Sequence, residues 1–138
     1  MTVPIISAYA GGLLIIMQAL LMVTVGLHRG KSGVSLGLGD DPVLERKIRR
    51  HGNLAENAAI FIVVLALAEI TVVPGGVIKT IAIVFLAARL FHAIAMSTVI
   101  GSHGGEGSKV FVVARVLGAL GTFGSFLALG GFLLYHLV

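Results

Sequence analysis

The sequence predicts an all-α integral membrane protein built as a bundle of four transmembrane helices. Two observations indicate this class. The chain of 138 residues is 57% hydrophobic, with 12% charged residues and a mean hydropathy of +1.07, whereas about a quarter of the residues are charged in a soluble domain. Four apolar stretches, each long enough to cross a bilayer, also follow one another along the chain. We therefore expect one membrane domain over residues 1–138 and no separate soluble domain.

The predicted spans are Val3–Leu27, about Val43–Ile70, Gly76–Thr98 and Val110–His136. The first stretch is too long for the apolar part of a signal peptide and follows no basic segment, so we expect a retained helix. The second starts behind Asp40, Asp41 and Pro42, a typical helix start because carboxylates complement the positive end of the helix dipole. The third follows a turn at Pro74. The connection at 100–108 is rich in Gly and Ser and is expected to be mobile.

The distribution of Lys and Arg predicts the orientation. Six of these residues lie between His28 and Arg50, whereas Lys79 alone marks the second connection. By the positive-inside rule the first connection faces the cytoplasm and both termini face outward. The net charge of +4 does not indicate a nucleic-acid partner, because the basic residues gather near membrane ends rather than on a soluble face.

Two classes of chemistry are excluded by residue type. The chain has no Cys, so it has no disulfide, thiolate metal site or protein thiol nucleophile. No pair of His and Glu has the spacing of a metal-binding array, and we predict no metal. His28, His103 and His136 lie at span ends or in loops and are interpreted as interfacial residues; Glu69, at the outer end of the second span, is expected to be solvated.

Small residues recur at close-approach spacing in two of the spans. The fourth span carries Ala114, Gly118, Gly121 and Ser125, and the first carries Ala8 and Gly12. Such stripes let another helix approach closely. The partner helix can belong to the same bundle or to another subunit, and the sequence leaves both open. So many close-approach positions in a small chain favour a homo-oligomer.

A polar stripe enters the membrane along the second span. At 100° per residue, Arg46, Arg49, Asn53 and Glu56 fall within about 80° of one another on one helical face. Glu56 lies near mid-span, where a charged side chain costs about 2.5 kcal/mol or more. It needs a partner, and the sequence predicts an ion pair with Arg89, which the antiparallel third span places at similar depth.

The cations of this region outnumber its carboxylates. His92 follows Arg89 by one turn, and Arg115 enters the bilayer from the cytoplasmic end of the fourth span. Glu56 neutralises one guanidinium, so a small polyanion or zwitterion is expected to satisfy the others through bidentate contacts. Arg46 has an alternative reading, in which it merely reaches up to lipid phosphate.

These residues resemble a known family, the membrane-associated proteins in eicosanoid and glutathione metabolism, which includes microsomal glutathione transferases and leukotriene C4 and prostaglandin E synthases. The match is the pattern Glu45-Arg46-x-x-Arg49-x-His51-x-Asn53-x-x-Glu56 leading into an apolar span, supported by Arg89-x-x-His92. Four helices in about 140 residues fit the family over the whole chain, and the chain resembles its bacterial-type members.

The resemblance implies a homotrimer of a bacterial inner membrane, with glutathione bound between subunits on the cytoplasmic side. Carried over by position, Arg49, Asn53 and Glu56 are expected to bind glutathione, with His92 near it and Arg29 as a further basic residue. Arg46 and Arg89, the other cations of this region, complete the predicted glutathione-binding residues. Arg115 is similar to the family Arg that stabilises the glutathione thiolate and is the catalytic candidate. Two positions depart from the pattern: Met96 stands where several members have Tyr, and Asn57 where some have an aromatic residue.

Three function classes follow. The first is a glutathione-dependent transferase or peroxidase acting on lipophilic electrophiles that arrive through the surrounding membrane lipid. The second is a non-catalytic membrane protein in which the same residues serve assembly or lipid binding. A small transporter is disfavoured, because the polar groups gather in the cytoplasmic half and supply no continuous path.

Overall fold

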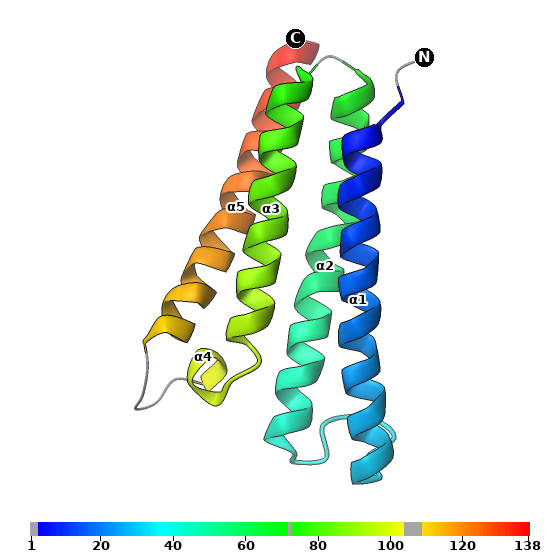
Figure 1. The fold of residues 1–138 in the computed structure, drawn as a ribbon, viewed down its shortest axis with the longest axis vertical. Coiled ribbons are helices and arrows are strands. Elements are labelled where there is room, and N and C mark those ends of the chain that lie inside the picture. The colour runs from blue at the N-terminus through cyan, green and yellow to red at the C-terminus, as the bar shows by residue number, and fades with distance from the viewer. Residues whose placement is uncertain (1–2, 72, 104–108) are drawn as a thin grey trace.

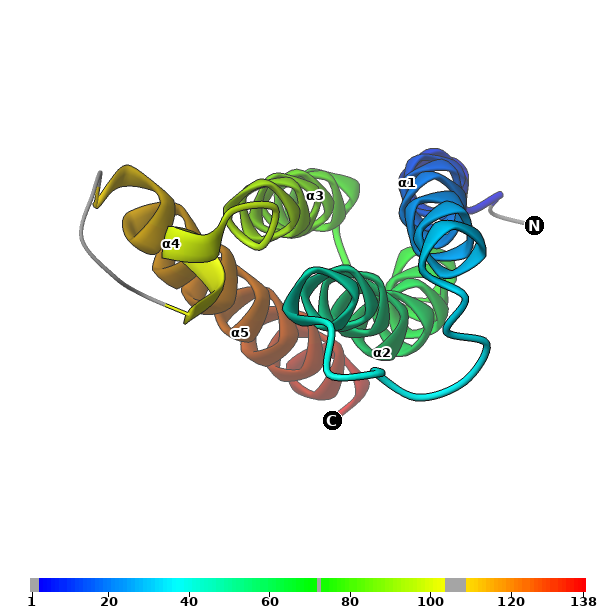
Figure 2. The same cartoon turned by 90° about the horizontal axis from the view of Figure 1, so that it is seen from below.

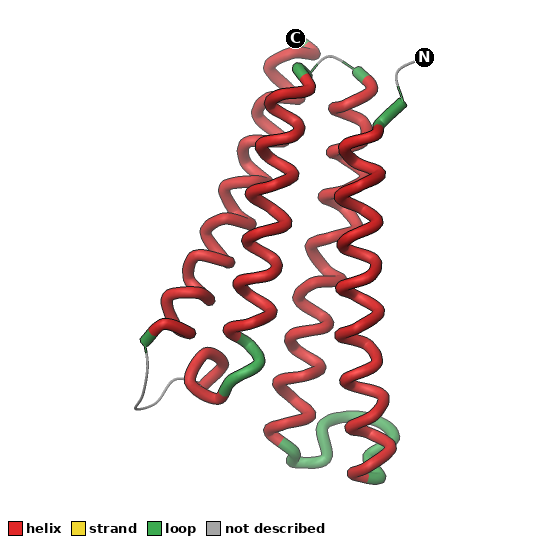
Figure 3. Tube along the Cα trace, viewed as in Figure 1, coloured by secondary structure: helices red, strands yellow, loops and turns green. Residues whose placement is uncertain are grey.

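The computed structural model describes residues 3–71, 73–103 and 109–138. Its helices run in the order α1 (Ile5–Ser32), α2 (Pro42–Ile70), α3 (Gly75–Ala95), α4 (Val99–His103) and α5 (Val110–Leu137). Figure 1 shows the long helices standing side by side, with the start of α1 and the end of α5 at the same end, and Figure 3 shows the loop that joins α1 to α2 at the other end. Since α1, α2, α3 and α5 are long and apolar enough to cross a bilayer, the predicted all-α, four-helix membrane fold is confirmed.

The helix ends follow local chemistry. The carboxylate of Asp41 caps α2 by accepting from the backbone N–H groups of Val43 and Leu44 at 2.9 and 3.0 Å. At the other side of this loop, α1 runs five residues beyond the predicted Leu27, through polar residues that leave the apolar stretch. It stops at Gly33, whose φ of 71° is the left-handed conformation that glycine adopts without strain.

Glu69 corrects one expectation. It is not simply solvated, because its carboxylate accepts from the backbone N–H groups of Ile6 and Ser7, both at 2.8 Å, and from the Ser7 hydroxyl at 2.6 Å. These are donors at the start of α1 that have no partner within their own helix. The end of α2 therefore caps the start of α1 and joins the two helices.

The helices are arranged as two neighbouring pairs. The most extensive contact is between α3 and α5, followed by that between α1 and α2, and the end-on view of Figure 2 shows this pairing. Three aromatic rings join the pairs: Phe61 of α2 stacks on Phe85 of α3 with centroids 3.6 Å apart, and Phe126 of α5 lies 5.9 Å from each. These rings fill the middle of the bundle with apolar surface.

The small residues of α5 serve packing within the bundle. A Cβ on Gly118 would lie 2.8 Å from the Ala88 carbonyl oxygen of α3, and one on Gly121 would lie 2.8 Å from the Ala88 Cβ. Close approach of α5 to α3 therefore requires both glycines. On α1, by contrast, Gly12 has nothing within 4 Å of its ideal Cβ position, and its face stays open.

The short helix α4 is an addition to the predicted elements. It begins one residue after Thr98, the predicted end of the third span, and continues into the connection that follows, where it packs on α5. A Cβ on Gly101 would overlap the Ala95 carbonyl, so this return of the chain onto the end of α3 depends on glycine. The rest of that connection, 104–108, lies outside the described residues, and with it the expectation of mobility.

Candidate functional site

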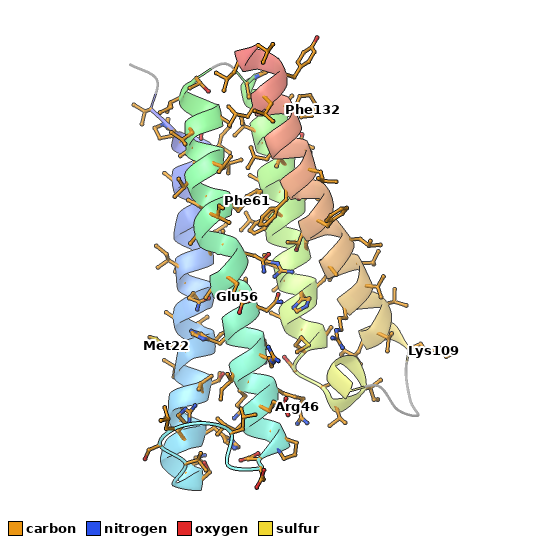
Figure 4. All side chains as sticks on the ribbon, turned by 180° about the vertical axis from the view of Figure 1, so that it is seen from behind. Met22, Arg46, Glu56, Phe61, Lys109 and Phe132 are labelled. Atoms are coloured by element: carbon orange, nitrogen blue, oxygen red, sulfur yellow. The ribbon has the colours of Figure 1, made fainter. Side chains whose placement is uncertain are left out.

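A cleft of about 490 Å³ lies between α2 and the α3–α5 pair. We call it the cleft throughout. Its lining residues are Glu45, Arg46, Ile48, Arg49, Gly52, Asn53, Glu56, His92, Met96 and Arg115. Figure 4 places Arg46 near the loop end of α2 and Glu56 close to the middle of that helix. The cleft therefore extends from the end of the bundle into the membrane span.

The structure brings six of the predicted site residues into this cleft: Arg46, Arg49, Asn53, Glu56, His92 and Arg115. The α2 residues come from one helical face, as the spacing predicts. His92, buried to 9% exposure, approaches from α3, and Arg115 approaches from α5. Arg115 also donates to the Gly101 carbonyl at 3.2 Å, which ties α4 to the same wall.

Arg89 corrects the predicted Glu56–Arg89 ion pair. Arg89 is 3% exposed, and its Nη1 donates to Asn53 Oδ1 at 2.6 Å while Nη2 reaches the Gly118 carbonyl at 3.4 Å. In the described part of the chain, no Lys or Arg nitrogen lies within 4.0 Å of the Glu56 carboxylate. The pair fails because Asn53, one turn before Glu56, meets Arg89 first, which leaves Glu56 exposed in the cleft.

Arg29 is the other predicted site residue that this chain does not bring to the cleft. Its Nη1 donates to the Val34 carbonyl at 3.0 Å and closes the loop after α1. The charge of the cleft is also more balanced than expected. Its described lining carries the guanidinium groups of Arg46, Arg49 and Arg115 and the carboxylates of Glu45 and Glu56, which leaves one surplus positive charge.

A comparison of the sequence with models of protein families identifies the family of this chain. The model of the MAPEG family matches residues 7–135, nearly the whole chain. The chain belongs to the MAPEG family. No curated protein and no solved structure matches the chain. The predicted resemblance is therefore confirmed, and the chain is a membrane protein of the glutathione and eicosanoid metabolism family.

Sequence reasoning omitted four lining residues of this MAPEG cleft from the candidate site: Glu45, Ile48, Gly52 and Met96. A signal for three of them was available. Glu45 and Gly52 fall four residues before and three after Arg49, on the face that carries the stripe, and Met96 follows His92 by one turn. Ile48 has no such polar signal, since an apolar residue at the edge of a stripe is usual in a membrane helix.

A second polar group lies on the other side of α2 in this MAPEG chain. Arg50 donates from Nη1 to the Ser97 hydroxyl at 2.5 Å and from Nη2 to the Thr24 hydroxyl at 3.1 Å. His51 Nε2 lies 2.7 Å from Gln18 Nε2 of α1, so His51 projects away from the stripe. These contacts join α2 to α1 and to the end of α3 and set the rotation of α2 that turns its stripe into the cleft.

At the loop end of the MAPEG bundle, three polar side chains form a linked group. His28 Nε2 lies 2.7 Å from Asp41 Oδ2, and Lys47 Nζ lies 3.0 Å from His28 Nδ1. The hydrogen bond from His28, together with those from the N–H groups of Leu44 and Val43, holds the pKa of Asp41 below its ordinary value of 3.8. This group fixes the loop that precedes the polar stripe.

Proposed function

We propose that this MAPEG protein is a glutathione-dependent transferase or peroxidase that acts on lipid-soluble electrophiles. The observation that carries the proposal is the cleft itself. It gathers Arg46, Arg49 and Arg115 from two helices around Asn53 and Glu56, in a chain that belongs to a family of glutathione and eicosanoid metabolism.

The charged groups of the cleft fit those of glutathione. Glutathione carries two carboxylates and one ammonium group. Guanidinium groups such as those of Arg46 and Arg49 bind carboxylates through two parallel hydrogen bonds, and the exposed carboxylate of Glu56 accepts from an ammonium group. A volume of about 490 Å³ lies within the usual range for a small-molecule site. Under this proposal Arg46 binds a carboxylate of glutathione rather than a lipid phosphate.

Arg115 is the proposed activator of the thiol. An unperturbed thiol of this kind has a pKa of about 8.5, and a neighbouring cation lowers it by stabilising the thiolate. Arg115 supplies both a positive charge and N–H donors from the side of the cleft opposite the α2 stripe. The thiolate is then the nucleophile for an electrophile dissolved in the membrane.

The assembly and orientation are part of the proposal. We propose a homotrimer in a bacterial inner membrane with the loop before α2, and hence the cleft, on the cytoplasmic side. In such an assembly Arg29 lines a glutathione site from a neighbouring subunit. The many exposed apolar side chains of α1 and α5, such as Leu13, Leu20 and Leu127, then contact either lipid or another subunit.

A glutathione titration followed by thiolate absorbance tests the function. We expect saturable binding by the wild-type protein, weakened about 10- to 100-fold by Arg49→Ala or Glu56→Ala, because each removes a charged hydrogen-bonding group. Arg115→Ala is expected to retain most of the binding and to lose the thiolate signal. Lys109→Ala, which removes a cation at the same end of α5 but outside the cleft, is the matched control.

Two outcomes would reject the proposal. In the first, the wild-type protein shows no saturable glutathione binding and the oligomer dissociates in the Arg49 and Glu56 variants. That result would indicate the non-catalytic membrane protein instead. A thiolate signal that persists in Arg115→Ala and is lost in Lys109→Ala would remove the activator assignment. Product analysis with an electrophile and with a hydroperoxide then separates conjugation from peroxide reduction.

A further inference from the structure

A second cavity of about 260 Å³ adjoins the cleft. We call it the inner pocket. It shares Asn53 and His92 with the cleft and is otherwise lined by Asn57, Arg89, Ala119, Thr122, Phe123 and Phe126. The same three helices therefore form both cavities, and two of their side chains lie between them.

The inner pocket lies about one helical turn deeper than the cleft on α3 and α5, and it borders the deep end of the cleft on α2. On α5 the lining passes from Arg115 to Ala119 and on the antiparallel α3 from His92 back to Arg89, whereas on α2 it passes from Glu56 to the adjacent Asn57. Three or four residues of helix correspond to about 4.5–6 Å. A molecule in the inner pocket therefore lies beside one in the cleft, on the side away from the loop end.

One wall of the inner pocket is polar and positively charged. Arg89 is buried, and the hydrogen bonds of its guanidinium go to neutral oxygens of Asn53 and Gly118. Its Nε has no hydrogen-bond partner, and no carboxylate of the described residues lies within 4.0 Å of it. A buried guanidinium without a counter-charge favours a ligand oxygen that carries, or takes up, negative charge.

The opposite wall is apolar and opens outward. Ala119 and Phe123 are exposed on α5, Phe123 to 62%, and Phe126 lies behind them among the stacked rings. An alkyl chain can leave the pocket past these residues into lipid. The pocket thus fits the polar end of an amphipathic molecule, with an oxygen at Arg89 and an apolar tail along α5.

We propose that the inner pocket binds the carbonyl end of a lipid-soluble α,β-unsaturated carbonyl compound, with Arg89 as the positive group beside its oxygen. This inference rests on the proposed function. In such a compound the electrophilic carbon is two carbons away from the carbonyl carbon, so an oxygen at Arg89 leaves the reacting carbon on the side nearer the cleft. An alkyl halide, by contrast, has no oxygen for Arg89, and an epoxide has its oxygen bonded directly to the reacting carbon.

The reaction balances without a further reagent. The glutathione thiol releases its proton to water, and the thiolate sulfur forms a bond to the β-carbon. The π electron pair of the C=C bond shifts through the conjugated system to the carbonyl oxygen, which becomes an enolate. Arg89 stabilises this negative charge, and the enolate then takes one proton from water to give the saturated conjugate.

Photolabelling tests the pocket without turnover. The probe is a saturated medium-chain ketone with a diazirine beside its carbonyl, applied to the purified full-length protein in detergent. We expect labelling of peptides that contain Asn57 or Thr122, and a loss of about tenfold or more in Ala119→Leu, which fills the pocket from the exposed face of α5. Leu120→Phe, on the neighbouring residue outside the pocket, is the matched control and should keep the label.

Kinetics with two electrophiles test the role of Arg89. For Arg89→Gln we expect the ratio of kcat with an enone to kcat with benzyl chloride, which has no oxygen, to fall on the order of 100-fold. Equal losses for both would overturn the role, because they indicate a structural effect. If Arg89→Gln does not fold, the labelling decides: unchanged labelling in Ala119→Leu overturns the pocket. Labelling without any glutathione binding overturns the proposed function instead.

Discussion

At the residue scale, the contact between Arg89 and Asn53 determines how the Asn53 side chain is used. A guanidinium has donors only, so the atom that faces Arg89 Nη1 at 2.6 Å must be the amide oxygen Oδ1. The Nδ2 group of Asn53 is then left for the cavities that this residue lines. Under the proposed function, Asn53 therefore donates to an acceptor of glutathione such as a carboxylate or an amide carbonyl.

Asn53→Asp separates this binding role from folding. The new carboxylate still accepts from Arg89, now as a charge-assisted hydrogen bond, so the thermal stability should be kept or raised. The donor to the ligand is lost and a negative charge replaces it, so glutathione affinity should fall about tenfold or more. Thermal unfolding and a glutathione titration on the same sample measure both effects. Wild-type affinity in Asn53→Asp would contradict the assignment, and Asn53→Ala should lose stability as well.

The residues of the stripe were predictable from the sequence, whereas their partners were not. Helical spacing alone places Arg46, Arg49, Asn53 and Glu56 on one face. Which of them contacts Arg89 depends on the rotation and depth of α3 relative to α2. A shift of one helical turn makes Asn53, rather than Glu56, the partner of Arg89. Periodicity within one helix carries no information about that offset, so the predicted ion pair was wrong although both residues lie in the right region.

At the scale of the element, Asp41 in the loop before α2 makes the free energy of unfolding depend on pH. Asp41 accepts from His28 and caps α2, and these hydrogen bonds lower the pKa of its carboxyl below 3.8. A group with a lowered pKa in the folded state stabilises the fold at pH above its unfolded value, and this contribution disappears as the pH falls through the lower, folded value.

Asp41→Asn tests this sign. Asn can still cap the helix, so the substitution removes mainly the charged part of the interaction with His28. Wild-type protein should have the higher melting temperature near neutral pH, and the difference should shrink as the pH falls below 3.8. Asp40→Asn, one residue earlier and outside this hydrogen-bonded group, is the control and should give no such trend. A difference that grows toward acid pH would contradict the mechanism.

The α3–α5 pair depends on glycine at a defined position. A Cβ on Gly118 would lie 2.8 Å from the Ala88 carbonyl oxygen and from the backbone nitrogen of His92, and backbone atoms cannot turn away. We expect Gly118→Ala to destabilise the protein by about 1–3 kcal/mol and to displace His92 in the cleft. Gly124→Ala, with nothing within 4 Å of the added methyl, should be neutral or slightly stabilising. Thermal unfolding of the two variants in one detergent makes the comparison.

The elements show the same limit of sequence reasoning as the residues. Apolar length predicts the four spans, because the bilayer dictates it. It does not predict that α1 continues to Ser32 or that α4 forms, because a left-handed Gly33 and a Gly101 without space for a Cβ decide those ends. The capping of α1 by Glu69 was missed for a related reason, since the two residues that it joins are more than sixty positions apart.

At the scale of the whole molecule, polar and apolar functions are divided along the bundle. The cleft opens toward the loop end, the inner pocket extends deeper along α3 and α5, and the stacked rings of Phe61, Phe85 and Phe126 lie beyond it. Within the described residues this polar series therefore ends at an apolar block near the middle of the bundle. A polar cavity that is open at one end only agrees with the proposed binding and chemistry near the membrane surface and not with transport across the membrane.

The orientation of the bundle can be measured directly, because the chain has no Cys and any single introduced Cys is labelled without background. Leu36→Cys lies in the loop before α2, where Leu36 is 90% exposed, and Val138→Cys lies at the opposite end. With six Lys and Arg residues flanking that loop, we expect a membrane-impermeant maleimide to label Val138→Cys on intact cells and Leu36→Cys only after lysis. The reverse pattern would place the cleft, and any glutathione bound there, outside the cytoplasm. It would thereby also contradict the supply of glutathione on which the proposed reaction depends.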